Sequence, residues 1–163
     1  MIGKRHQKAM RDVEEAELAA LVDTVPGVSG LATEWSVPFF ETTDSMLKEI
    51  APDGVIVCTP TEVHLEPVLQ SLDAGAHVLV EKPITASLEE ARQIIEKASA
   101  TRKQVLVGHH RRHYGILHKT KQLLNDGVLG QLIAVQGMWT TRKADAYYEP
   151  EWRKLRSSGP VLI

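Results

Sequence analysis

The sequence predicts an α/β fold built around a doubly wound parallel sheet, and two patterns support this prediction. Short apolar runs alternate with longer segments whose apolar residues recur at helical spacing. Within residues 53–83, a β-branched run, Val55–Val57, and a second apolar run, Val78–Val80, flank one such helical segment. Two strands joined by a helix form a βαβ unit, whose strands are parallel and whose crossover is right-handed. Ligands bind such sheets beyond the carboxyl ends of the strands, so the residues that follow each strand are the first site candidates.

The segment before this unit carries shorter patterns. We expect a helix over residues 3–12, short strands over 17–22 and 37–40, and a loop over 24–30. Pro26 and two glycines indicate the loop, which leaves room for a short helix through Trp35. Asp44 is the expected N-cap of a further helix that ends at Ile50.

The two central helices are predicted from their periodicity and their ends. In the first, Gly75 stands where a C-cap is expected, and the apolar positions at helical spacing are Leu65, Val68, Leu69 and Leu72. The second begins with a capping box, Ser87 to Glu90, in which the serine hydroxyl and the glutamate carboxylate accept from unpaired backbone amides. Its expected core positions are Ala91, Ile94, Ile95 and Ala98, and residues 104–108 form the next buried strand.

The composition changes after residue 108. Residues 109–118 read HHRRHYGILH, a helix is expected through Leu117 and Leu124, and residues 132–139 resemble a strand. We therefore predict a nucleotide-binding domain over residues 1–118, incomplete at its start, and the beginning of a second domain over 119–163. Because the last five residues also resemble an interrupted strand, we expect a chain truncated at both ends.

The composition argues against several classes of protein. The net charge is −2, from 19 basic and 21 acidic residues, so no general field attracts nucleic acid or an anionic membrane. Cys58 is the single cysteine, which excludes an intramolecular disulfide and fits a reducing compartment. No apolar run approaches the roughly 20 residues that span a bilayer, and the first residues lack the apolar core of a signal peptide. We expect a cytoplasmic protein.

Asp23 is a candidate ligand for a dinucleotide. It ends a predicted strand 20 residues after Gly3, and dinucleotide-binding folds place an acidic residue at about that distance from a glycine-rich turn. Gly3 fits the third glycine of that turn. A carboxylate at this position repels a 2′-phosphate, and no arginine follows it, so Asp23 favours NAD over NADP. The alternative is a solvated aspartate in a loop.

Two further motifs follow the strands of the central unit. After the first strand, Thr61 is the expected N-cap of the helix and His64 lies in its first turn, near the ligand edge. The alternative is a capping turn with a surface histidine. After the second strand, Glu81 and Lys82 place two charges beside a buried segment, where charges either reach solvent or meet a ligand. Lys82 suits contact with a substrate oxygen and help with its deprotonation; the alternative is an exposed ion pair.

The histidine-rich stretch 109–118 invites a metal or nucleic-acid interpretation, and neither is favoured. His109 and His113 are four residues apart, but no H-E-x-x-H motif accompanies them, so we predict no metal site. The basic cluster is local, and no nucleic-acid module surrounds it. We interpret the stretch as a linker whose cations face an anionic cofactor or a polyol. Cys58 is expected to be a small buried residue without special reactivity.

Together, the T-P-x-x-x-H motif at Thr59–His64, the E-K-P motif at Glu81–Pro83, Gly108 and the Arg111–Arg112 pair resemble the Gfo/Idh/MocA family. These proteins are NAD(P)-dependent oxidoreductases of the glucose–fructose oxidoreductase and inositol dehydrogenase type. The resemblance implies a Rossmann-like domain, here without its first strand, followed by an α/β domain with an open sheet. It also implies a sugar, inositol or related polyol as substrate, NAD as cofactor and a homo-oligomer.

The resemblance assigns roles to individual residues. It implies a catalytic Lys82, whose bond to Pro83 is often cis in relatives, and cofactor contacts from Gly3, Asp23, Thr59, Pro60, His64, Glu81 and Lys82. It implies substrate-side positions at Arg111, Arg112, Trp152 and Arg153. The first strand, two glycines and a later aspartate–histidine pair of the family are absent from this sequence. The alternative to part of a dehydrogenase is therefore a catalytically inactive nucleotide-binding or oligomerising module.

Overall fold

The computed structural model describes residues 2–149, and the chain alternates helices and strands over most of this range. The helices are α1 (Gly3–Met10), α2 (Ser29–Trp35), α3 (Thr43–Ile50), α4 (Leu65–Asp73), α5 (Leu88–Thr101) and α6 (Gly115–Asn125). The strands are β1 (Leu21–Val22), β2 (Phe39–Phe40), β3 (Gly54–Val57), β4 (His77–Val80) and β5 (Val105–Val107). Short 3₁₀ turns occupy η1 (Pro26–Val28), η2 (Thr61–Val63), η3 (His110–His113) and η4 (Asp145–Tyr148).

All strand pairs are parallel, which confirms the predicted α/β class. Strands β3, β4 and β5 form a three-stranded sheet in that order, and β1 pairs with β2 in a separate two-stranded sheet. The register places Val57 opposite Val80, and Val80 opposite Val107. The three main strands therefore end side by side, at one edge of the sheet.

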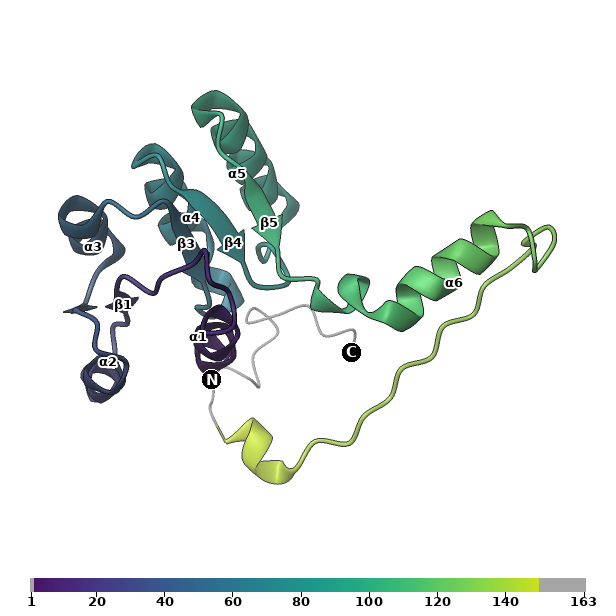
Figure 1. Cartoon of the computed structure of the whole chain (residues 1–163), viewed down its shortest axis with the longest axis horizontal. Helices are drawn as coiled ribbons and strands as arrows, with labels where there is room; N and C mark the ends of the chain where they lie inside the picture. Colours follow the sequence, from purple (N-terminus) through teal and green to yellow (C-terminus); the bar gives the residue numbers. More distant parts are fainter. Residues whose placement is uncertain (1, 150–163) are drawn as a thin grey trace.

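The hydrophobic core lies between the three-stranded sheet and helices α4 and α5, which pack against one another (Figure 1). Its buried members are Val57, Val68, Leu72, Val78, Val80 and Ile94. Each such side chain stabilises the fold by about 1.5–3 kcal/mol through removal of its apolar surface from water. This core holds the central βαβ unit in place, and with it the edge where the strands end.

Several predicted helix ends are confirmed, and one is wrong. The Oγ of Ser87 accepts from the Glu90 amide while the Glu90 carboxylate accepts from the Ser87 amide, both at 3.2 Å, so the capping box is present. Gly75 ends α4 with a φ of +83°, a conformation that favours glycine. The N-cap of α3 is Thr42 rather than Asp44, because the Thr42 hydroxyl accepts from the Ser45 amide.

The predicted core face of α5 contains one error. Ile94 is fully buried, whereas Ile95 is 64% exposed. One residue along a helix is a rotation of about 100°, so Ile95 leaves the face that Ile94 presents to α4 and the sheet. The covered face of α5 includes the buried Ile94 and the half-buried Ala91 and Ala98.

The described residues after β5 form a different kind of structure. Helix α6 leads away from the sheet, and the segment that follows it turns back as an extended trace (Figure 1). Every described residue from 109 to 149 is exposed. The predicted strand at 132–139 is wrong for the described chain, because no other strand lies beside it to accept its backbone hydrogen bonds. The predicted domain boundary after residue 118 falls within α6 and stays a prediction. No helix in residues 2–149 is both long and apolar enough to cross a bilayer.

Adjacent isoleucines on α5 provide a matched test of this packing. We expect Ile94→Ala to lower the free energy of unfolding by about 2–5 kcal/mol, because it removes buried methyl groups and leaves a cavity. Ile95→Ala should change it by no more than about 0.5 kcal/mol. Urea denaturation of both variants measures the difference, and equal losses would contradict the orientation of α5.

Candidate functional site

The candidate site lies at the edge where β3, β4 and β5 end. The parallel register continues one residue beyond each strand: the Glu81 amide donates to the Val57 carbonyl at 2.9 Å, and the Gly108 amide donates to the Val80 carbonyl at 2.8 Å. Cys58, Glu81 and Gly108 therefore form a row across the edge. We call it the edge row.

Glu81 uses both of its carboxylate oxygens inside the protein. Its Oε1 accepts from His6 Nε2 of α1 at 2.8 Å, and its Oε2 accepts from the Lys82 amide at 3.2 Å. A Cβ on Gly108 would lie 3.2 Å from Oε1, so a glycine next to this carboxylate gives it the room it occupies. The Glu81 side chain is only 12% exposed. Both carboxylate oxygens of Glu81 therefore bind groups of the protein itself, and its contact with a cofactor stays a prediction.

His64 is buried, with 1% of its surface exposed, and joins two loops of the site. Its Nε2 contacts the Thr59 carbonyl at 2.9 Å, and its Nδ1 contacts the carbonyls of Pro83 and Ile84, both at 3.1 Å. The ring therefore fastens the loop after β3 to the loop after β4. The alternative of a surface histidine is wrong, since every polar atom of this ring meets backbone.

The local structure around His64 also differs from the prediction. Helix α4 begins at Leu65, so His64 precedes it, and the expected cap Thr61 lies in the 3₁₀ turn η2 without a capping hydrogen bond. Thr61 is itself buried. His64 lies between η2 and α4, and its side chain is buried rather than on the helix surface.

Lys82, Thr59 and Pro60 remain exposed around these buried anchors. The Lys82–Pro83 peptide bond is cis, as the resemblance implied. Lys82 follows Glu81 directly, and Thr59 carries the carbonyl that His64 holds. The structure thus brings three of the predicted site residues to one edge and leaves their side chains accessible.

Asp23 and Gly3 lie on the amino-terminal part of the chain. Asp23 follows β1, and its Oδ1 accepts from the Val25 amide at 2.9 Å in a local turn, which leaves Oδ2 for another donor. Gly3 is the first residue of α1. A Cβ at Gly3 would meet no described atom within 4 Å, so no strand of the described chain packs closely against this glycine.

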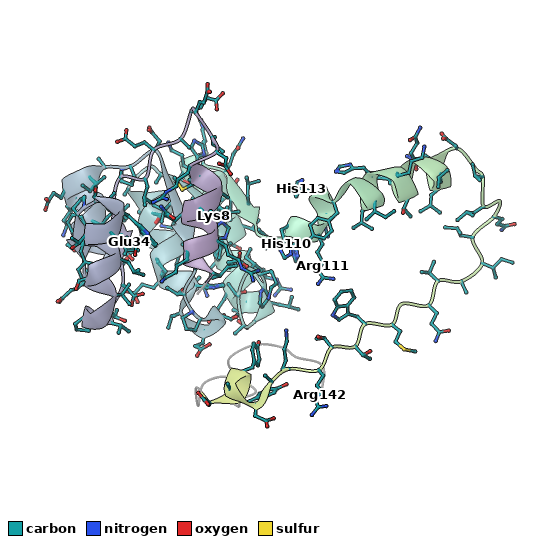
Figure 2. The ribbon with its side chains drawn as sticks, turned by 60° about the horizontal axis from the view of Figure 1, so that its bottom comes forward. Lys8, Glu34, His110, Arg111, His113 and Arg142 are labelled. Atoms are coloured by element: carbon teal, nitrogen blue, oxygen red, sulfur yellow. The ribbon has the colours of Figure 1, made fainter. Side chains whose placement is uncertain are left out.

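The predicted substrate-side arginines follow Gly108 of the edge row by three and four residues. Arg111 and Arg112 are exposed in η3, and the Arg111 guanidinium stacks over the Trp139 ring at 3.9 Å. Figure 2 shows His110, Arg111 and His113 together at the start of α6, and Arg142 on the extended segment beyond it. Trp152 and Arg153 lie outside the described residues. Within residues 2–149, no three metal-ligating side chains form a group that could hold a metal ion.

Most of the chain, including this edge, matches a known protein family. Residues 1–109 match the family GFO_IDH_MocA, described as an oxidoreductase family with an NAD-binding Rossmann fold. The chain belongs to this family. The matched range ends one residue after the edge row and includes Gly3, Asp23, His64 and Lys82.

Curated relatives and solved structures agree with this membership. The chain is 30% identical to D-glucoside 3-dehydrogenase of Escherichia coli K12, with 82% of this chain and 37% of the relative covered. It is 28% identical to inositol 2-dehydrogenase of Rhizobium meliloti, with 80% and 40% covered. It is also 28% identical to scyllo-inositol dehydrogenase of Lactobacillus casei with bound NAD(H) and scyllo-inositol, at a TM-score of 0.74, covering 79% of this chain and 39% of that structure. The chain thus spans about two fifths of the length of these proteins.

The residues present fit a dinucleotide such as NAD. The first turn of α1 contains no acidic residue and carries Lys4 and Arg5, and the first turn of a helix leaves backbone amides for an anion. Asp23 keeps one carboxylate oxygen for a hydroxyl donor, while Thr59 and Lys82 offer exposed polar groups at the edge. Two surface grooves, of about 350 and 470 Å³, lie elsewhere, along α4 and α5.

His6 belongs to the candidate site although no sequence motif singled it out. Its partner Glu81 is 75 residues away, so the pair has no local signature. The available signal was its place three residues after Gly3, on the helix expected to face the cofactor. Only the fold shows that α1 and the end of β4 meet.

Cys58 provides a chemical test of the edge row. Burial, and then the negative charge of Glu81, raise the pKa of the Cys58 thiol to about 12. At about pH 8 we therefore expect iodoacetamide to react with the folded chain at least about tenfold more slowly than with the urea-unfolded chain, because the thiolate is the nucleophile.

The raised pKa of Cys58 also predicts that the free energy of unfolding falls as the pH rises above about 9, because the unfolded thiol then loses its proton while the folded one keeps it. Cys58→Ala should not show this pH-dependent loss of stability.

Glu81→Gln is the control for the cause of the shift. It removes the charge and keeps the burial, so alkylation should become faster without reaching the rate of the unfolded chain. Equal rates for folded and unfolded wild-type chains would show that Cys58 is not the protected thiol described above.

Proposed function

We propose that this chain forms the nucleotide-binding part of an NAD-dependent dehydrogenase that acts on a hydroxyl group of a sugar, an inositol or a related polyol. The observation that carries the proposal is the accessible Lys82, held next to a cis-proline at the edge of a parallel sheet by buried Glu81 and His64. Its family membership and the dehydrogenases to which it is similar support the same class of reaction. NAD, when bound, supplies the hydride chemistry.

The residues of this chain have separable tasks in the proposal. The start of α1 binds the pyrophosphate, and the open oxygen of Asp23 accepts from the adenosine ribose. Thr59 and Pro60 line the cofactor beside the edge. Lys82 contacts the reacting oxygen of the substrate, lowers the cost of its deprotonation and orients the carbon that bears it. Arg111 and Arg112, with Trp152 and Arg153, are proposed on the substrate side.

Asp23 should determine the choice of cofactor. In calorimetric titrations we expect the chain to bind NADH more tightly than NADPH, because the Asp23 carboxylate repels the 2′-phosphate. Asp23→Ala should weaken NADH binding by about tenfold, because a hydrogen bond to a charged group is lost. It should also reduce the difference between the affinities for NADH and NADPH. Glu34→Ala, on the neighbouring helix α2, is the control. An unchanged preference in Asp23→Ala would remove this residue from the site.

Lys82 should act on turnover rather than on cofactor binding. In any preparation of the protein that reduces NAD with a polyol, we expect Lys82→Ala to lower kcat by about 10²–10⁴-fold, the usual contribution of a positioned acid or base. Its affinity for NADH should stay within about threefold. Lys48→Ala, an exposed lysine paired with Asp44, is the matched control. Full turnover in Lys82→Ala would exclude the lysine from the mechanism.

A second candidate function is an oligomerising module without catalysis. The observation in its favour is the exposed apolar surface of residues 116–139, which includes Ile116, Val128, Leu129, Ile133, Val135 and Trp139. We propose that this surface forms the contact of a homo-oligomer. The cytoplasmic location expected from the sequence is a separate prediction. Light scattering coupled to size exclusion separates the alternatives: self-association combined with indifference to NADH favours the module.

A further inference from the structure

We propose that the hydrogen bond between His6 and Glu81 is a positioning contact that fixes helix α1 against the end of β4 and thereby sets the affinity of the edge for the nicotinamide cofactor. The inference rests on the proposed function for its second half, because α1 is the helix proposed to bind the pyrophosphate. That the hydrogen bond fixes α1 against the end of β4 is argued from the contacts of His6 and Glu81 and does not depend on the proposed function.

Among the described residues, helix α1 is only partly covered: Gly3, His6, Gln7 and Met10 are half-buried, and its other residues are exposed. None of its residues is buried. Within residues 2–149, the contact from His6 to Glu81 is the one hydrogen bond or ion pair that joins residues 2–16 to the rest of the described chain. The His6 side chain is 24% exposed, so it is sheltered from competing water. This contact is therefore the directional interaction that sets where α1 lies against the end of β4, beside the partial packing of its half-buried residues.

Glu81, in contrast, is a fixed acceptor. Its amide continues the β3–β4 ladder, and its Oε2 is held by the Lys82 amide. The carboxylate also packs against Gly108, where a Cβ would lie 3.2 Å from Glu81 Oε1. A hydrogen bond to an ionised acceptor is stronger than one between neutral groups. The same carboxylate thus connects α1 to the residue that precedes the cis-proline.

The chemistry of the contact defines the informative variants. A carboxylate only accepts, so His6 must donate from Nε2, which it does in the charged ring and in one neutral tautomer. Glutamine at position 6 carries an amide donor at a similar reach, whereas alanine carries none. Lys8 lies on the same helix with an exposed side chain (Figure 2) and provides the control for changes in helix propensity.

The experiment measures hydrogen exchange and NADH affinity for the wild-type chain and three variants, His6→Ala, His6→Gln and Lys8→Ala. We expect His6→Ala to speed exchange of the α1 amides without NADH, to leave β4 unchanged, and to weaken NADH binding by about tenfold or more. His6→Gln and Lys8→Ala should stay within about threefold of wild type in affinity. Unchanged α1 exchange in His6→Ala overturns the inference.

A double-mutant cycle with Glu81→Ala tests whether the two residues act through one contact. The double variant should lose no more NADH affinity than Glu81→Ala alone, and additive losses would contradict the contact. Circular dichroism checks that each variant is folded. If wild type fails to bind NADH, the proposed function fails while α1 exchange still decides the positioning role. If wild type binds and His6→Ala binds equally well, only the further inference fails.

Discussion

The shared register of β3, β4 and β5 is the constraint on which the candidate site depends. Because the three strands are parallel and in step, the residues that follow them must lie side by side. That geometry sets Cys58, Glu81 and Gly108 in one row. Glycine at position 108 leaves room for the Glu81 carboxylate, since a Cβ there would lie 3.2 Å from its Oε1. The raised pKa of the Cys58 thiol is one measurable consequence of this packing.

Two histidines extend this constraint from the strands to the loops and to α1. His64 joins the loops that follow β3 and β4 through three backbone carbonyls, and His6 joins α1 to Glu81. Both contacts are buried or sheltered, so both loops and the helix are held in place before any ligand arrives. This order reduces the entropy lost on binding. The Lys82 side chain is exposed beside the cis-proline, while its backbone amide donates to Glu81 as part of this support.

The sequence predicted the elements that carry a complete local signature. The capping box at Ser87 and the glycine after α4 are present because their stabilising contacts lie within a few residues of one another. The central βαβ unit is present because each of its strands and its helix has a clear apolar pattern of its own. Ile95 and the strand at 132–139 were predicted wrongly, because apolar character alone does not say which face is covered or whether a partner strand is available. The burial of His64 and the partnership of His6 depend on contacts 19 to 75 residues apart, which no local pattern contains.

We propose that the cofactor binds at the edge of the sheet where β3, β4 and β5 end. Nitrogen-15 chemical-shift mapping of the 163-residue chain during titration with NADH tests it most directly. We predict shifts in the amide signals after β3, at Cys58, Thr59 and Thr61, and after β4, at Glu81 and Lys82, together with those of Gly3 and Asp23. Shifts confined to the grooves along α4 and α5, or an unchanged spectrum from the folded chain, would contradict it.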